Sequence, residues 1–338
     1  MPDTVLQYQL SAPNGHFALV AVPRPIPGPT EVCIRTKAVA LNPLDAKKLA
    51  SGVAVESWPV VLGNDAAGVV ESVGDAVRDF RPGDEVFFIC GRENRSSAFQ
   101  EIVTISSRAV AQKPAHLSFE EVASLPLCYV TAAASIILGL NIPLPHLGFA
   151  SSNSLRSVLI LGGSSVVGAG AIQLLRQALP DATILTTSSA QHHAHLLSLG
   201  ATRCFERSVQ DDPSALLAAT PNGAGVDAII DAVGAAASQP SIFSALNPNG
   251  PNLYSQVATG ATVNVPEDVS VTVIRGPELF ARPEGDRVLP GLAELLDSGM
   301  YRLPVRVEVV GRGFGAIELG LRRLQGRVSG VKLVVTLK

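Results

Sequence analysis

The sequence predicts an α/β protein of two domains, one rich in short strands and one built on a doubly wound parallel sheet. Its 338 residues are enough for two domains that each have a core. Up to about residue 120 the chain is punctuated by proline and contains short β-type runs. From residue 122 to 285 strands alternate with helical patterns, which is typical of a parallel α/β unit.

The strand-rich domain is expected to resemble a barrel without long helices. Its predicted strands lie at 31–40, 67–73, 85–89 and 101–105, and a turn at 81–84 separates two of them. Amphipathic helices are predicted around 289–296 and 315–324, before a final strand at 331–337. Because that last strand is β-type, we expect it to return to the first domain, which would then comprise residues 1–121 and 286–338.

The most informative stretch opens the parallel unit. Residues 158–161 are Val, Leu, Ile and Leu, which predicts a strand buried on both faces. A turn of glycine and serine follows, and then apolar residues at helical spacing. Small residues let a dinucleotide pyrophosphate approach the backbone, and a helix N-terminus offers it unpaired N–H groups and the positive end of a dipole.

This turn matches the dinucleotide-binding fingerprint in part. Gly163 and Gly168 take the first and third glycine places, and Ser165 stands where the middle glycine belongs. The residues predicted to contact the pyrophosphate are Gly163, Ser164, Ser165, Val166 and Val167.

The next strand, at 182–187, indicates which dinucleotide is bound. NAD sites carry an Asp or Glu near this point, which accepts hydrogen bonds from the ribose 2′-OH, but this chain has Ser188 and Ser189. Neutral hydroxyls tolerate a 2′-phosphate, and His192 and Arg207 are nearby cationic candidates. The alternative is that these four are ordinary loop and helix-cap residues. The missing carboxylate favours NADPH as the cofactor.

Composition narrows the class of protein. The net charge of −3 gives no basic footprint for nucleic acid. The four cysteines are scattered without zinc or disulfide spacing, and the N-terminus lacks the pattern of a signal peptide, so the cytoplasm is expected. No charged residue lies between Glu121 and Arg156, but prolines and polar residues interrupt this segment. We interpret residues 130–140 as a buried helix and expect no membrane span.

Several further motifs carry a family resemblance. They are PIPGP at 25–29, LNPLDAK at 41–47, LGNDAAGVV at 62–70, PGDEV at 82–86, LPL at 125–127 and LGA at 199–201. On these motifs the chain resembles zinc-independent members of the medium-chain dehydrogenase/reductase superfamily, of the quinone oxidoreductase and enoyl reductase type. It is particularly similar to fungal trans-acting enoyl reductases. The resemblance implies a GroES-like barrel for the first domain and a Rossmann NADP-binding domain at 122–285.

The same resemblance argues against a metal. Zinc-dependent relatives have a Cys before a first-domain turn and a His in a Gly-His-Glu motif. Here the corresponding residues are Asn42 and Asn64, and of the four-cysteine structural lobe only Cys90 is present. Amide side chains are poor zinc ligands. A cluster of three histidines at 192–195 is expected on a helix surface, so we predict no metal site.

The implied activity is NADPH-dependent reduction of a conjugated C=C bond or a quinone, in secondary metabolism. In relatives of this type Asn42 faces the nicotinamide, although Asn42 and the proline after it could equally fix a turn. Tyr129 is a candidate proton donor or an ordinary buried tyrosine, and solvent is another proton source. Thr131 lines the nicotinamide-ribose side, and Val233 and Gly234 at a strand end contact that ribose.

Two other functions stay open. The scaffold could catalyse a non-redox or cyclising biosynthetic step with structural NADP, or it could bind NADPH without catalysis. The expected partner is a small-molecule substrate, free or as a polyketide on a carrier protein. The segment at 257–287 is short and irregular where many relatives form their dimer contact, so a monomer and a homodimer are both compatible with the sequence.

Overall fold

The computed structural model describes residues 3–148, 155–326 and 328–337. The chain forms two compact units, Met1–Leu127 with Arg306–Lys338, and Cys128–Val305. The second crossing between units therefore lies after residue 305 and not at the expected 285/286. The reason is that α7 (Val288–Asp297) packs on the short 3₁₀ turn Pro145–Leu147, so the chain stays with the second unit until β15 (Arg306–Arg312).

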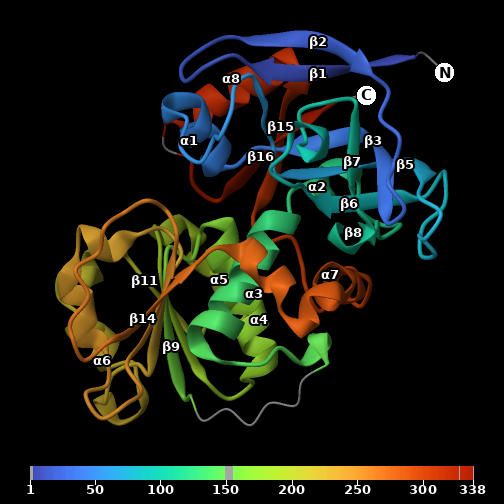
Figure 1. The fold of residues 1–338 in the computed structure, drawn as a ribbon. Helices are drawn as coiled ribbons and strands as arrows, with labels where there is room; N and C mark the ends of the chain where they lie inside the picture. The colour runs from blue at the N-terminus through green and yellow to red at the C-terminus, as the bar shows by residue number, and fades with distance from the viewer. Residues whose placement is uncertain (1–2, 149–154, 327, 338) are drawn as a thin grey trace. The chain divides into compact units, whose positions relative to one another are not determined.

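The first unit contains two sheets and little helix (Figure 1). Its strands are β1 (Thr4–Leu10), β2 (Phe17–Pro23), β3 (Glu31–Ala40), β4 (Val60–Val61), β5 (Asp65–Val73), β6 (Glu85–Ile89), β7 (Ile102–Ser106), β8 (Val110–Gln112), β15 (Arg306–Arg312) and β16 (Val331–Thr336). Its helices are α1 (Pro43–Ser51), α2 (Phe119–Ala123) and α8 (Gly315–Leu324). The smaller sheet has the order β2-β1-β4, and the larger runs β15-β16-β3-β5-β6-β8 with β7 paired to β3.

The last strand does return to the first unit. β16 pairs antiparallel with β3, with Val334 opposite Ala40. Leu333 and Val335 face the core of this unit together with Val39 and Leu41. The alternate residues of β16, which include Lys332, therefore point to the other face of the sheet.

The second unit is a six-stranded parallel sheet with flanking helices. Its strands are β9 (Ser157–Leu161), β10 (Thr183–Thr187), β11 (Arg203–Phe205), β12 (Ala228–Asp231), β13 (Leu253–Val257) and β14 (Ser270–Ile274). The helices are α3 (Pro126–Leu140), which begins at the end of the first unit, α4 (Val166–Ala178), α5 (His193–Ser198), α6 (Ser214–Leu217) and α7. Short 3₁₀ turns replace a full helix between β12 and β13, at Ala235–Ala237 and Pro240–Ala245.

The strand order β11-β10-β9-β12-β13-β14 confirms the doubly wound sheet. Counted along the chain it reads 3-2-1-4-5-6, the Rossmann order, in which the direction of winding reverses between β9 and β12. Ligands of such sheets bind at the carboxyl ends of the strands at this reversal. The irregular segment at 257–287 still provides an edge strand, β14, whose Val271 and Val273 are exposed.

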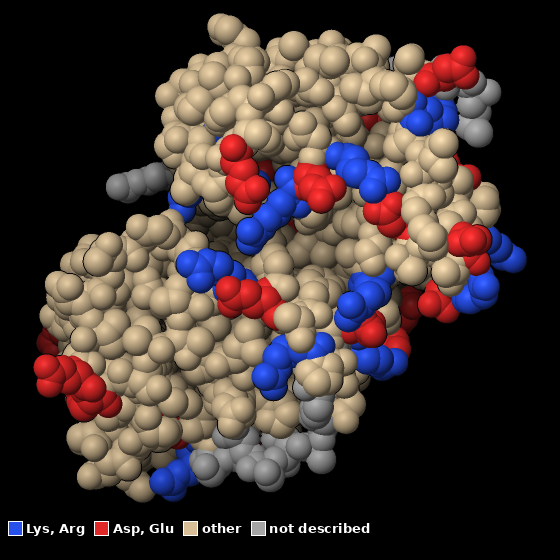
Figure 2. Space-filling model, viewed as in Figure 1, with Lys and Arg blue, Asp and Glu red and all other residues tan. Residues whose placement is uncertain are grey.

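The apolar segment after Glu121 forms α3, most of whose residues are buried. Within the part of the chain that the structure describes, none of the helices has the length and hydropathy that a membrane span needs. On the face shown in Figure 2, basic and acidic side chains are interspersed.

Candidate functional site

The turn between β9 and α4 has the geometry of a phosphate-binding loop. β9 is fully buried, and Gly162 directly after it has φ +77°, a conformation that favours glycine. A Cβ on Gly163 would lie 2.0 Å from Thr186 Oγ1 of β10, so only glycine fits there. Ser165 is the N-cap of α4, and its Oγ accepts the N–H of Gly168 at 3.0 Å.

Gly168 is required for a different reason. A Cβ on this residue would lie 2.4 Å from the carbonyl oxygen of Gly162 and 2.9 Å from Gly163 Cα. These are backbone atoms, which cannot move aside as a side chain can. The first turn of α4 therefore rests directly on the end of β9, while Ser165, Val166 and Val167 stay partly exposed.

The four residues predicted to bind the 2′-phosphate follow β10 and β11. Ser188 is buried, and its Oγ donates to the carbonyl oxygen of Ser189 at 3.2 Å. His192 is half-buried, and burial and the neighbouring Arg207 lower its pKa. Arg207 is exposed, and its charge acts on His192, so the structure brings these two side chains near each other.

The loop after β12 is held by a residue that the sequence analysis missed. Asp231 is fully buried, and its Oδ1 accepts the N–H groups of Val233, Gly234 and Ala235 at 3.2, 2.8 and 3.0 Å. Its Oδ2 accepts the N–H of Ala236 at 3.0 Å and the hydroxyl of Tyr254 at 2.9 Å. An Asp that ends a buried strand three residues before a glycine was the available signal.

This loop lies beside the turn after β9. A Cβ on Gly162 would be 2.5 Å from Cγ1 of Val233, which is 46% exposed. Gly234 has φ +74° and directly precedes the 3₁₀ turn Ala235–Ala237. The predicted pyrophosphate and ribose contacts thus meet at the reversal point of the sheet, where a Rossmann fold binds its ligand.

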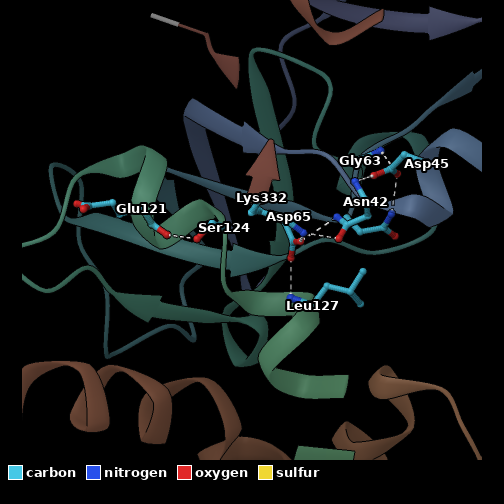
Figure 3. A network of polar contacts seen from close by, with 9 residues as sticks. Asn42, Asp45, Gly63, Asp65, Glu121, Ser124, Leu127 and Lys332 are labelled. Carbon is cyan, nitrogen blue, oxygen red and sulfur yellow. Dashed lines mark hydrogen bonds and ion pairs between the residues drawn. The ribbon is translucent and has the colours of Figure 1, made fainter. Parts of the chain in front are cut away.

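Asn42 belongs to a buried polar network in the first unit, which Figure 3 shows. Its Nδ2 donates to Asp65 Oδ2 at 2.8 Å, and its Oδ1 accepts from Lys332 Nζ at 2.5 Å. Lys332 also forms an ion pair with Asp65 at 3.2 Å, with side-chain exposures of 4% and 0%. Asp65 Oδ1 accepts the N–H of Leu127, in the first turn of α3.

Asp45 organises the other side of this network (Figure 3). Its carboxylate accepts the backbone N–H of Asn42 at 3.0 Å, the N–H of Gly63 at 3.1 Å and Nδ2 of Asn64 at 2.7 Å. Burial raises the pKa of Asp45 to about 6, against the opposing effects of Lys48 and the Asn42 N–H. Asn42 is also the N-cap of α1, with Pro43 at N1, so it both begins a helix and joins the network.

Tyr129 and Thr131 lie on α3 in the second unit. Tyr129 is fully buried, its hydroxyl lies 2.6 Å from His146 Nε2, and its ring packs edge-on against Tyr301. Burial raises the pKa of Tyr129 and lowers that of His146 to about 4, so both are neutral at pH 7. Thr131 is 7% exposed and lies against Gly276 after β14, where a Cβ would come within 2.6 Å of its Oγ1.

The donor set around Asn42 does not suit zinc. Zinc takes thiolate, imidazole or carboxylate ligands. Here the amide oxygen of Asn42 accepts from the ammonium group of Lys332, and the amide nitrogen of Asn64 donates to Asp45. Burial and the charges of Asp65 and Asp45 raise the pKa of the Cys90 thiol, which disfavours the thiolate that a metal needs. Across residues 3–148, 155–326 and 328–337, no three His, Cys, Asp or Glu side chains are grouped to hold a metal.

The three histidines at 192–195 lie in the segment that follows β10. His192 ends a 3₁₀ turn, and His193 and His195 lie in α5. His195 Nε2 is 2.8 Å from the carbonyl oxygen of Pro304.

Comparison with known proteins agrees with this architecture. Residues 28–115 match the alcohol dehydrogenase GroES-like domain, and residues 166–275 match the zinc-binding dehydrogenase family. The chain is 32% identical to the trans-enoyl reductase tndF of Aspergillus flavipes over 345 residues, which cover 97% of each protein. It is 29% identical to the dehydrogenase orf1 of Aspergillus niger over 340 residues, 96% of each.

A solved structure extends the likeness to the whole fold. An alcohol dehydrogenase superfamily protein from Novosphingobium aromaticivorans superposes with a TM-score of 0.80 at 25% identity, covering 99% of this chain and 100% of that one.

Proposed function

Because the chain belongs to the medium-chain dehydrogenase/reductase superfamily, we propose that it is an NADPH-dependent reductase that needs no zinc. Its substrate class is a conjugated enoyl or enone compound, or a quinone, in secondary metabolism. The observation that carries this proposal is the glycine- and serine-rich turn at the reversal point of the parallel sheet. The relative named as a trans-enoyl reductase supports the choice of substrate class.

The residues of the turn fit a bound pyrophosphate. Gly162, Gly163 and Gly168 keep the backbone free of side chains, and the N-terminus of α4 supplies the positive end of a helix dipole. Ser164 and Ser165 add hydroxyl groups at this end. Val233 and Gly234, fixed by Asp231, are assigned to the ribose on the nicotinamide side, and Thr131 lines that side as well.

We assign the 2′-phosphate to the residues that follow β10. Ser188 and Ser189 present neutral groups where an NAD site has a carboxylate. Arg207 provides the positive charge, and its exposed guanidinium can reach a phosphate with two parallel N–H groups. The neutral imidazole of His192 is proposed as a hydrogen-bond donor beside it. NADPH is therefore the proposed cofactor.

The buried network supports chemistry without a metal. When bound, the nicotinamide supplies a hydride to the β-carbon of the substrate. Negative charge then collects on the conjugated carbonyl oxygen, and we assign a donor to that oxygen, the Asn42 amide. An amide carries two N–H groups, and Asp65 accepts one of them, so the other is the proposed donor. Oriented donors at a developing oxyanion stabilise the transition state without reorganisation.

The α-carbon takes the proton that completes the reduction. Tyr129 is fully buried, and its hydroxyl is engaged in an internal hydrogen bond with His146. We therefore assign the proton to solvent and treat Tyr129 as a buried packing residue of α3. Carrier-protein attachment of the substrate is part of the proposal, because an enoyl thioester has the conjugated carbonyl that this chemistry needs.

The test is turnover of NADPH with three acceptors: an enoyl thioester, a simple quinone and a saturated ketone. We expect oxidation of NADPH with at least one of the first two and none with the ketone, which lacks the conjugated C=C bond. With the enoyl substrate in D₂O, deuterium should appear at the α-carbon while the β-carbon receives the hydride of NADPH. Tight NADPH binding without turnover of either conjugated acceptor would instead favour a non-redox or purely binding role.

A further inference from the structure

We infer that Lys332 is a positioning residue: its ammonium group fixes which way the Asn42 amide faces and strengthens that amide as a donor. The inference rests on the proposed function, in which Asn42 donates to the substrate oxygen. It assigns to a side chain of this protein part of the charge stabilisation for which zinc-dependent relatives use a metal.

The geometry sets the direction of the amide. Lys332 Nζ lies 2.5 Å from Asn42 Oδ1 and Asp65 Oδ2 lies 2.8 Å from Nδ2, so a donor faces the amide oxygen and an acceptor faces the amide nitrogen. A flipped amide would place NH₂ against an ammonium group and a carbonyl against a carboxylate. Both contacts would be repulsive in a buried site, so one orientation is selected.

The backbone holds these groups in register. The N–H of Leu41 donates to the carbonyl oxygen of Leu333 at 2.9 Å, which joins the residue before Asn42 to the residue after Lys332. Asp65 begins β5 and pairs with Ala40 of β3. Two strands of one sheet and the start of α1 thus place the three side chains, as Figure 3 shows.

Polarisation follows from the same arrangement. An ammonium group on the carbonyl oxygen withdraws electron density from the amide, and a chain of hydrogen bonds in a low-dielectric interior strengthens each member. The second N–H of Asn42 therefore becomes a better donor to an oxygen that gains negative charge. Stability alone does not explain the ion pair, because apolar residues of similar volume replace buried pairs at little or no cost.

The decisive variant is the double substitution Lys332→Met with Asp65→Asn. It removes both charges together, so neither partner of the ion pair is left unpaired in the core, and it lets the Asn42 amide rotate to the opposite orientation. We expect a folded protein with unchanged affinity for NADPH and kcat for the enoyl substrate reduced by about tenfold to a hundredfold. This is less than the roughly hundredfold to thousandfold cost of losing an oxyanion donor outright, because the amide is still present but no longer oriented. If the ion pair were only structural, the double variant would keep both the kcat and the melting temperature of the unmodified protein. That result would show the inference to be wrong.

One further variant separates the possible failures. Asn42→Ala keeps the Lys332–Asp65 ion pair and tests the proposed donor itself. An unchanged kcat in this variant would remove the role of Asn42 in the proposed function, and the inference about Lys332 would fall as well. A slow Asn42→Ala beside a fully active double variant would overturn only the role of Lys332.

The matched control is Lys113→Met. Lys113 is 6% exposed, pairs with Glu85 at 3.0 Å and lies in the same unit but outside the network. We expect it to lower stability and leave kcat unchanged, and a loss of kcat equal to that of the double variant would count against a specific role for Lys332.

Discussion

The loop after β12 depends on a single buried carboxylate, and Asp231→Asn tests that dependence. The substitution keeps the shape of the side chain but replaces one carboxylate oxygen by NH₂. The orientation that preserves most contacts leaves the oxygen facing Val233, Gly234 and Ala235. The new NH₂ then faces the N–H of Ala236 and the hydroxyl of Tyr254. The hydroxyl can rotate to accept a hydrogen bond, but the buried N–H of Ala236 has no such freedom.

The expected cost follows from these contacts. One buried N–H left without an acceptor costs about 1–3 kcal/mol, and the three remaining bonds lose the strength that a charged acceptor gives them. The neutral side chain of the Asp231→Asn variant no longer carries the cost of burying a negative charge, which offsets part of this loss. We therefore expect the free energy of unfolding to fall by about 2–4 kcal/mol. Tyr254→Phe is the matched control, because it removes one hydroxyl bond and keeps all four N–H bonds; its expected cost is about 1 kcal/mol.

Urea denaturation and calorimetric titration with NADPH measure both consequences. We expect Asp231→Asn to weaken NADPH binding by about tenfold, or 1.4 kcal/mol, because Val233 and Gly234 lose their fixed position. Tyr254→Phe should bind NADPH as the unmodified protein does. If Asp231→Asn unfolded at the same urea concentration and bound NADPH equally well, the carboxylate would not be what holds this loop.

Four more outcomes are expected. Ser165→Leu should abolish NADPH binding in calorimetry while the protein stays folded, whereas Gly168→Leu should lower the melting temperature because its side chain meets backbone atoms; retained binding in the first would contradict the pyrophosphate assignment. NADPH should bind at least about tenfold more tightly than NADH, and Ser189→Asp should reverse that order; equal affinities would remove the argument. Elemental analysis should find well under one zinc per chain, with activity insensitive to a chelator; zinc lost together with activity would overturn this. Because the pKa of His146 is lowered to about 4, the folded state resists its protonation, and stability should fall as the pH drops from about 6.5 to 4. That loss should reach up to about 3 kcal/mol in the unmodified protein and should be absent in His146→Phe. Parallel curves of stability against pH for the two proteins would refute this.

The strand, turn and helix proposed to bind the cofactor were predictable as structure because their signals are contiguous. A buried strand, a small-residue turn and an apolar helix follow each other within residues 157–178, so no long-range pairing had to be guessed. The glycine places also translate directly into distances, since Gly163 and Gly168 each lack room for a Cβ. Asp231 carried a local signal as well, but an Asp at a strand end fits many turns. Four of its five donors are N–H groups of the loop that follows, and the fifth, the hydroxyl of Tyr254, comes within reach only through the pairing of β12 with β13.

The domain boundary was harder because helix patterns do not say what a helix packs against. The sequence predicts the amphipathic helix near 289–296, and α7 confirms it. Its partner, however, is the turn Pro145–Leu147, more than a hundred residues earlier. Gly291 of α7 lies close to His146 and Leu147, where a Cβ would approach within about 3 Å of both side chains. That contact keeps the segment with the second unit.

Lys332 shows most clearly why a site escapes the sequence. It lies 290 positions from Asn42, and its role depends on the register between the last strand and β3. The terminal strand was predicted to return to the first domain, but alternation along it places Leu333 and Val335 in the core and Lys332 on the opposite face. A shift of one residue would reverse these faces, bury the ammonium group among apolar side chains and leave Asp65 without its cation. The partners of Lys332 thus favour the observed register themselves, so the same ion pair that orients the Asn42 amide helps to fix how β16 pairs with β3.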